Sequence, residues 1–155
     1  MQNPPNFNTP ADLATLTEFN RLRHDPGAAT IRPIFERVFD TLYGASRTLA
    51  VYGSLAPGRE NHHVIAHLAG EWRDGSVTGD LHATGWGAAL GFPALRWRSD
   101  GPRVPVRVLQ SDRLTVAEWA RLDEFEGTEY RRILVPVYHD GGLLAVANLY
   151  EGTQQ

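Results

Sequence analysis

Glycine and proline divide the chain after residue 52 into short pieces, and this most limits the folds it can adopt. Thirteen of its 15 glycines and five of its 10 prolines lie there. Short apolar runs between such residues are typical of strands in a β sandwich or barrel. The region before residue 45 has helical spacing instead. We therefore predict an α+β chain, with an N-terminal tail and helical extension over 1–45 and a β domain over 46–155.

The N-terminal region carries signals for two helices. Thr9 is suited to cap the first helix and Pro10 to occupy its first position. A second apolar face predicts a helix over 33–43, with Gly44 at its C-terminal cap. Residues 1–8 look like a disordered polar tail. The sequence leaves open whether the helices cover one side of the barrel or dock a partner, including a second copy in a homodimer.

Composition excludes several classes of protein. The net charge is −3 and the basic residues are dispersed, so we expect no nucleic-acid partner. No apolar run approaches the roughly 20 residues that span a bilayer, so we expect no membrane association. The absence of cysteine excludes disulfides and thiolate metal sites, and agrees with a cytoplasmic protein.

Turn signals organise the later strands. Asp74-Gly75 is a strong turn pair, so the run around it predicts either one strand or a hairpin. Asp100-Gly101 predicts a hairpin turn, and Pro105 predicts an edge strand or a bulge. The strands themselves are expected over 71–83, 93–97, 104–109, 130–138 and 143–150. Between the first two, 86–93 is the kind of Gly-rich segment that approaches a ligand or another backbone.

The stretch Tyr52–His63 follows a short predicted strand and breaks at glycine and proline. Gly53 lets the backbone turn sharply and lets a ligand approach it closely. Successive N–H groups in such a turn can form a concave anion site. The alternative is an ordinary surface turn. Ser54 lacks the Gly-x-Ser-x-Gly context of a nucleophile, so local hydrogen bonding is its expected role.

A carboxylate lies on the apolar side of the clearest predicted helix, 115–126. Thr115 and Glu118 form a capping box there, and Leu114 and Trp119 a hydrophobic staple. Glu126 projects from the apolar stripe in the last turn, where burial and the helix dipole both raise a carboxyl pKa. Such a carboxylate suits general base catalysis near neutral pH.

Two alternatives apply to that carboxylate. Asp123, one turn earlier, leans toward the same side and is a second candidate base. Alternatively, Glu126 turns to solvent and pairs with Arg131 or Arg132. The histidines are weaker candidates for a functional site. His63 and His67 lack an obvious third ligand, so we expect no metal site.

Two motifs together resemble the γ-glutamylcyclotransferase-like, or AIG2-like, family. Val-Tyr-Gly-Ser-Leu at 51–55, with Pro57-Gly58 and Asn61-His62, is similar to the family's opening motif. Leu-Asp-Glu-Phe-Glu-Gly at 122–127, followed by Tyr130-Arg-Arg, is similar to its second. The resemblance covers about residues 47–151 and is closer to the γ-glutamylamine cyclotransferase branch.

That resemblance implies a small mixed β barrel with flanking helices. It implies cyclisation of the glutamyl part of a γ-glutamyl amine or amide to 5-oxoproline, with no cofactor. By similarity, the glutamyl part is held by Tyr52, Gly53, Ser54 and Leu55. Glu126 is the implied acid/base, and Tyr130 matches an aromatic residue of the pocket wall. The alternative is a non-catalytic module of the same fold that binds a small carboxylate or serves regulation.

Overall fold

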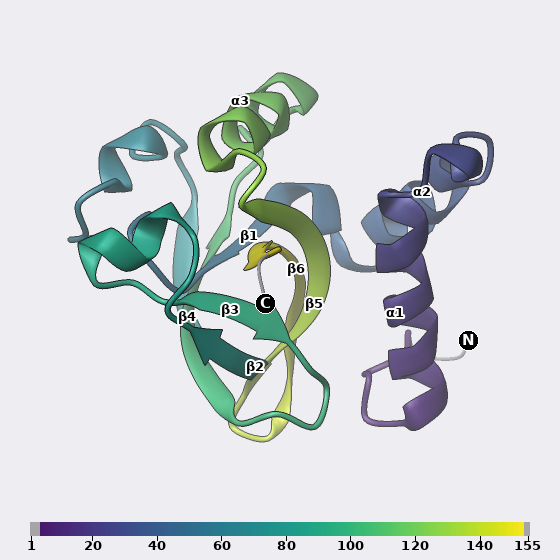
Figure 1. Cartoon of the computed structure of the whole chain (residues 1–155). Coiled ribbons are helices and arrows are strands. Elements are labelled where there is room, and N and C mark those ends of the chain that lie inside the picture. Colours follow the sequence, from purple (N-terminus) through teal and green to yellow (C-terminus); the bar gives the residue numbers. More distant parts are fainter. Residues whose placement is uncertain (1–3, 154–155) are drawn as a thin grey trace.

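The computed structural model describes residues 4–153, which form a five-stranded mixed barrel with one extra strand (Figure 1). The predicted α+β barrel is thus confirmed. The strands are β1 (Thr48–Val51), β2 (Glu71–His82), β3 (Ala94–Trp97), β4 (Arg103–Gln110), β5 (Tyr130–His139) and β6 (Gly142–Gly152). The α-helices of the described part are α1 (Pro10–Arg23), α2 (Arg32–Tyr43) and α3 (Val116–Glu126).

The barrel closes because the first long strand contacts the last pair. The strand order is β3-β2-β4-β1-β6-β5, and β5 returns to β2 where Ser76 faces Tyr138. A Cβ at Gly75 would lie 2.5 Å from Val137 Cγ1, so only glycine lets β5 come this close. The hairpin alternative at Asp74-Gly75 is therefore wrong, because both residues lie within the continuous strand β2.

Two other turn-based expectations need correction. The Asp100-Gly101 turn forms, with the Gly101 N–H bonded to Arg98 O at 3.0 Å, but β3 pairs with β2 rather than β4. Pro105 does not mark an edge strand, since β4 lies between β1 and β2. It is tolerated because β1 ends at Val51, opposite Arg107, and so has no residue opposite Pro105.

The N-terminal helices pack against the outer face of β5 and β6, where Figure 1 shows them beside the barrel. Leu134 of β5 joins their apolar cluster, whereas its neighbours Ile133 and Val135 join a cluster of the barrel. This alternation is the period of two expected for a strand covered on both faces. The helices and the strands thereby share a core, which consists of Phe7, Leu16, Phe19, Phe39, Ala45, Leu134 and Val146.

The helix ends agree with the sequence. The Thr9 hydroxyl accepts from the Asp12 N–H at 3.2 Å, and α2 ends at Gly44 with φ +63°. The predicted apolar face of α2 is only partly buried, because Val38 and Leu42 are 45% and 44% exposed. Docking of a second copy through these helices stays a prediction.

The expected disordered tail is wrong for residues 4–8, and residues 1–3 lie outside the described part. Phe7 is only 3% exposed and its ring lies 5.7 Å from that of Tyr43. Its carbonyl oxygen accepts from the Tyr138 hydroxyl at 2.9 Å. One aromatic side chain in a polar stretch was enough to anchor the segment, since burying it removes a large apolar area from water.

Helix α3 lies over one end of the barrel (Figure 1). Thr115 caps it by accepting from the Glu118 N–H at 3.4 Å, and Leu114 and Trp119 are buried in one cluster. The other half of the capping box is absent, because the Glu118 carboxylate binds Arg121 and a histidine instead. Across 4–153, no helix combines the length and the apolarity that crossing a membrane would require.

Candidate active site

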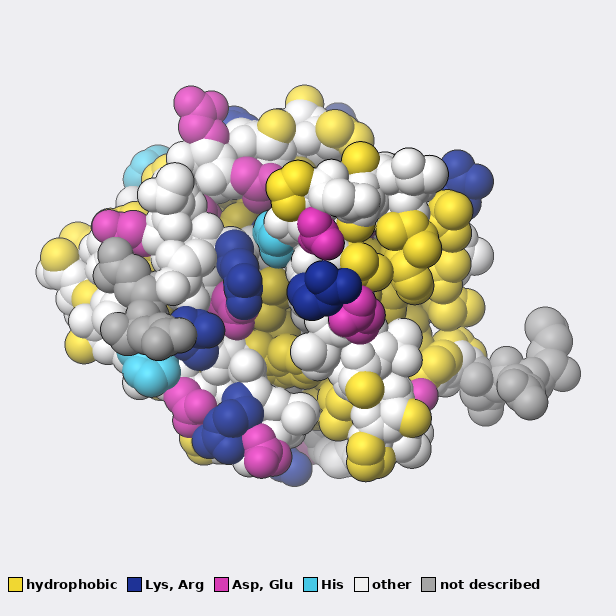
Figure 2. Space-filling model, turned by 45° about the vertical axis from the view of Figure 1, so that its right-hand side comes forward, with side chains coloured by type: hydrophobic (Ala, Val, Ile, Leu, Met, Phe, Trp, Pro, Cys, Tyr) yellow, Lys and Arg dark blue, Asp and Glu magenta, His cyan; other side chains and the backbone are white. Residues whose placement is uncertain are grey.

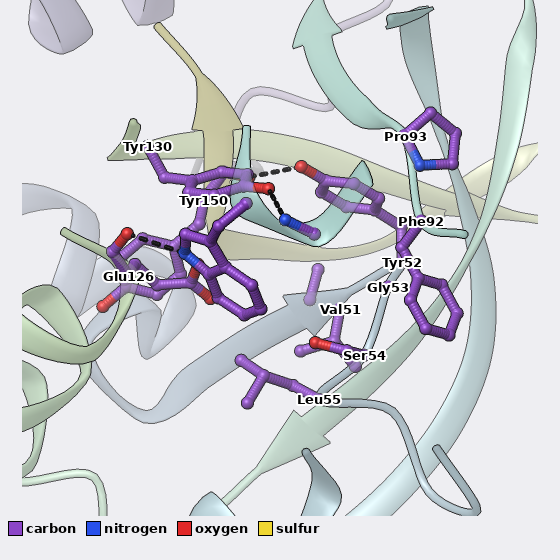
Figure 3. Close-up of a pocket in the computed structure, with 13 residues that line it drawn as sticks. Val51, Tyr52, Gly53, Ser54, Leu55, Phe92, Pro93, Glu126, Tyr130 and Tyr150 are labelled. Atoms are coloured by element: carbon purple, nitrogen blue, oxygen red, sulfur yellow. Dashed lines mark hydrogen bonds between the residues drawn. The ribbon is translucent and has the colours of Figure 1, made fainter. Parts of the chain in front are cut away.

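A single pocket brings together all six residues that the sequence singled out (Figure 3). It lies between the loop after β1, the end of α3 and the segment that contains the 3₁₀ turn η4 (Trp86–Leu90). The six are Tyr52, Gly53, Ser54, Leu55, Glu126 and Tyr130. Its other large lining side chains are Trp86, Phe92, Pro93 and Tyr150. The sequence had marked 86–93 only as a segment that approaches a ligand or another backbone, and had assigned Tyr150 no site role.

Glu126 is buried at this pocket, with 7% of its surface exposed. Its carboxyl group forms no hydrogen bond or ion pair with the residues between 4 and 153. Burial, and then the charge of Asp123, raises its pKa to about 8. The solvent-facing alternative is wrong, because Arg131 pairs with Glu151 at 2.7 Å and Arg132 with Asp123 at 2.9 Å.

Asp123, the second candidate base, has the opposite character. It does not line the pocket at Glu126. Burial raises its pKa, but hydrogen bonds from Arg132 and from the Tyr150 hydroxyl at 2.6 Å outweigh burial and lower it overall. Asp123 therefore stays ionised and acts on Glu126 as a nearby negative charge, which disfavours a second ionised carboxylate.

The loop after β1 offers unpaired donors to the pocket. Within residues 4–153, the N–H groups of Gly53, Ser54 and Leu55 donate to no protein acceptor. Consecutive free N–H groups form the kind of concavity that binds a carboxylate or an oxyanion. The Ser54 hydroxyl accepts from the Asn61 amide at 2.9 Å, which confirms its local hydrogen-bonding role.

Two tyrosines join the walls of the pocket. The Tyr52 hydroxyl donates to Tyr150 O at 2.7 Å and accepts from the Leu95 N–H at 3.0 Å, so it links β6 to β3. The Tyr130 hydroxyl accepts from the Gly87 N–H at 3.1 Å. The Tyr52 hydroxyl is used as both donor and acceptor, whereas the Tyr130 hydroxyl accepts one bond and donates to no acceptor within residues 4–153.

The segment around η4 forms the remaining wall. Trp86 Nε1 donates to Glu126 O at 3.0 Å, and its ring meets the Tyr130 ring edge-on. A Cβ at Gly85 or Gly87 would lie 2.5 or 2.9 Å from the Tyr130 hydroxyl, so glycine is required for this contact. The Gly-rich pattern of 86–93 had indicated such a close approach but gave no means to identify its partner.

The cavity is small. Its volume is about 40 Å³, more than the roughly 10–15 Å³ that one water needs but little for a glutamyl group, and it is partly open to solvent. Phe92 borders one side, because its Cβ lies 3.6 Å from the position of a Cβ on Gly53. A glutamyl group would therefore extend toward solvent or displace Phe92 or the adjoining η4 segment.

His63 and His67 lie away from this chemistry, whereas His62 Nδ1 lies 2.9 Å from Leu55 O in the loop after β1. His67 pairs with Glu118 at 2.9 Å, and His63 Nδ1 lies 3.2 Å from Glu60 O. In the described part of the chain no group of three or more His, Asp or Glu side chains is placed to hold a metal ion.

Comparison with known proteins identifies the family. The model described as "Gamma-glutamyl cyclotransferase, AIG2-like" matches residues 49–155. The chain belongs to this family. The match begins at β1, so α1 and α2 precede the AIG2-like domain. Comparison with curated proteins gives no match.

Solved structures have the same fold as the AIG2-like domain. YkqA from Bacillus subtilis is 26% identical, with a TM-score of 0.53. The match covers 69% of this chain, and this chain spans only 36% of the length of YkqA. An AIG2-like protein from Mus musculus is 23% identical with a TM-score of 0.52, over 70% of this chain and 78% of that one. PH0828 from Pyrococcus horikoshii is 21% identical with a TM-score of 0.51, over 70% of this chain and 79% of PH0828.

Proposed function

We propose that the chain is a γ-glutamylcyclotransferase that converts a γ-glutamyl amine or amide to 5-oxoproline and the free amine. The observation that carries the proposal is the buried Glu126 carboxyl, whose raised pKa of about 8 matches a proton-exchanging group near neutral pH. The family supports cyclotransfer as the reaction class. Tyr52, Gly53, Ser54, Leu55 and Tyr130 are the proposed substrate-binding residues.

The reaction forms one C–N bond and breaks another within the substrate. Glu126 as carboxylate takes a proton from the substrate's α-ammonium, and the resulting amine attacks the side-chain carbonyl carbon. The attacking nitrogen then loses a second proton, and the departing nitrogen receives one as its bond to carbon breaks. The amine is released, and the spare proton ends on the amine or in solvent. Because the nucleophile is tethered, ring closure avoids much of the entropic cost of a bimolecular step.

The loop after β1 supplies the electrostatic part. Its three free N–H groups suit either the α-carboxylate of the substrate or the oxyanion that forms during attack. Glu126 and these groups border the same cavity, as the mechanism requires. The pocket is small and partly open to solvent, so a bound glutamyl part would extend toward solvent or displace Phe92 or the η4 segment.

The test is release of 5-oxoproline from a panel of γ-glutamyl amines, amides and peptides. Glu126→Gln keeps the size of the side chain but removes the acid/base, so the rate is expected to fall at least about a hundredfold. Glu124→Gln is the matched control, because Glu124 lies exposed on the same helix and does not line the cavity. Full activity of Glu126→Gln on a good substrate would refute the mechanism.

A second candidate function is a non-catalytic module that binds a small carboxylate. The free N–H groups of 53–55 favour it, because such groups suit a carboxylate whether or not Glu126 moves protons. Thermal stabilisation by 5-oxoproline or glutamate, with no product from any member of the panel, would favour this module over the enzyme.

A further inference from the structure

A groove lies between the N-terminal helices and the barrel. Its volume is about 440 Å³, within the range of roughly 300–1,000 Å³ typical of small-ligand sites. Four arginines line it, namely Arg23, Arg32, Arg131 and Arg132. Figure 2 shows basic and acidic side chains around a hollow on this face, and the chain has no lysine, so every basic side chain drawn in dark blue is an arginine.

Two of these arginines are committed to carboxylates. Arg23 holds Glu36 through Nε and Nη2, at 2.7 and 2.9 Å. Arg132 holds Asp123 through the same two atoms, at 2.9 and 3.2 Å. These bidentate pairs neutralise both carboxylates that line the groove.

The other two arginines keep unused donors. Arg32 forms no ion pair within 4–153, because it donates only to the carbonyl oxygens of Leu22 and Asp25. Arg131 holds Glu151 through Nε and Nη2, which leaves its Nη1 without a described acceptor. Both side chains line the groove, so their free N–H groups are available to a ligand.

His24 lies among these arginines. It lines the groove, and its Nε2 lies 2.8 Å from Arg132 O. Partial burial lowers the pKa of this imidazole, and the charges of Arg131, Arg23 and Arg132 lower it further. The hydrogen bond to Arg132 O opposes this shift by raising the pKa, and the arginine charges act on the ring because it lies beside them.

We propose that this groove is a binding site for the carboxylate or phosphate group of a small anion, held by Arg32 and Arg131 beside the ring of His24. The planar guanidinium fork matches the paired oxygens of both groups. Arg32 comes from the extension and Arg131 from the barrel, so the site exists only where the two parts meet. Tyr130 and Tyr150 also line the cavity at Glu126, so the groove adjoins the candidate active site.

The test is an NMR titration of the labelled full chain with inorganic phosphate and, separately, with succinate, against sodium chloride of equal ionic strength. Saturable shifts of the His24 ring signals are expected, together with a rise in its pKa, because a bound anion stabilises the imidazolium. Saturation by either anion supports the site, and the anion that binds more tightly identifies the source. His24→Gln assigns the ring signals.

Variants of Arg32 distinguish binding at a defined site from a non-specific effect of ions on the protein. Arg32→Gln is expected to weaken binding about tenfold or more through loss of a charge-assisted hydrogen bond. Arg32→Lys keeps the charge without the fork and should bind with intermediate affinity. Arg98→Gln, which removes a surface arginine paired with Asp80 and Asp100, is the control and should bind normally. No saturation by either anion, or equal binding by Arg32→Gln and the native chain, would overturn the proposal.

Discussion

Glu126→Gln is expected to stabilise the fold while it removes the proposed activity. The folded pKa of about 8 lies above the ordinary 4.5, so the folded state favours the protonated form. Stability from this group is complete below about pH 4.5 and is lost as pH rises toward 8. With about 1.4 kcal/mol per pH unit, the 2.5 units between pH 4.5 and 7 correspond to roughly 3.5 kcal/mol.

Glutamine has nearly the same shape as glutamate and no charge, so the variant does not lose stability through ionisation of a buried group. We expect the variant to exceed the native chain in free energy of unfolding by about 3.5 kcal/mol at pH 7, with the difference shrinking to near zero at about pH 4.5. Urea unfolding at several pH values measures it, with Glu124→Gln as the control. A difference that stays constant or shrinks as pH rises would refute the assignment of a buried, raised-pKa carboxyl.

Three further predictions concern the same fold and cavity. If Glu126 is the base, the rate of 5-oxoproline release should rise with pH up to an apparent pKa of about 8, and a rate independent of pH from 6 to 9 would contradict it. Gly53→Ala places its methyl group in ordinary contact with Phe92 and at an unstrained φ, so unfolding should change little while turnover falls sharply because the methyl fills a small cavity. Phe7→Ala should destabilise the chain by about 3–5 kcal/mol in urea unfolding, whereas a free tail would show no change.

Local signals predicted the helices and the strand pieces well. The caps at Thr9, Gly44 and Thr115 needed only neighbouring residues, so the sequence contained all the necessary information. The pairing of strands did not follow from such signals. Asp74-Gly75 is a turn pair by composition, yet it stays extended because Val137, far along the chain, packs where a Cβ would be.

The candidate site was predicted to a similar degree. Helical spacing placed Glu126 on the buried side of α3, and the motif resemblance supplied the loop at Tyr52–Leu55. The walls at Trp86 and Tyr150 could not be derived, because each depends on a hydrogen bond or stacking contact between distant segments. The groove beside α1 was missed for the same reason, since its arginines come from three separate elements.

Asn20 of α1 hydrogen-bonds the main chain of β5. Its side-chain amide donates to Leu134 O and accepts from the Leu134 N–H, both at 2.8 Å. A helix residue thus satisfies both main-chain groups of one residue on β5, whose outer edge otherwise meets β2 only at Tyr138. The family domain cut free at residue 49 would expose that edge together with the apolar face under α1. Such an edge is a template for strand addition between molecules, so we expect the isolated domain to self-associate more readily than the full chain.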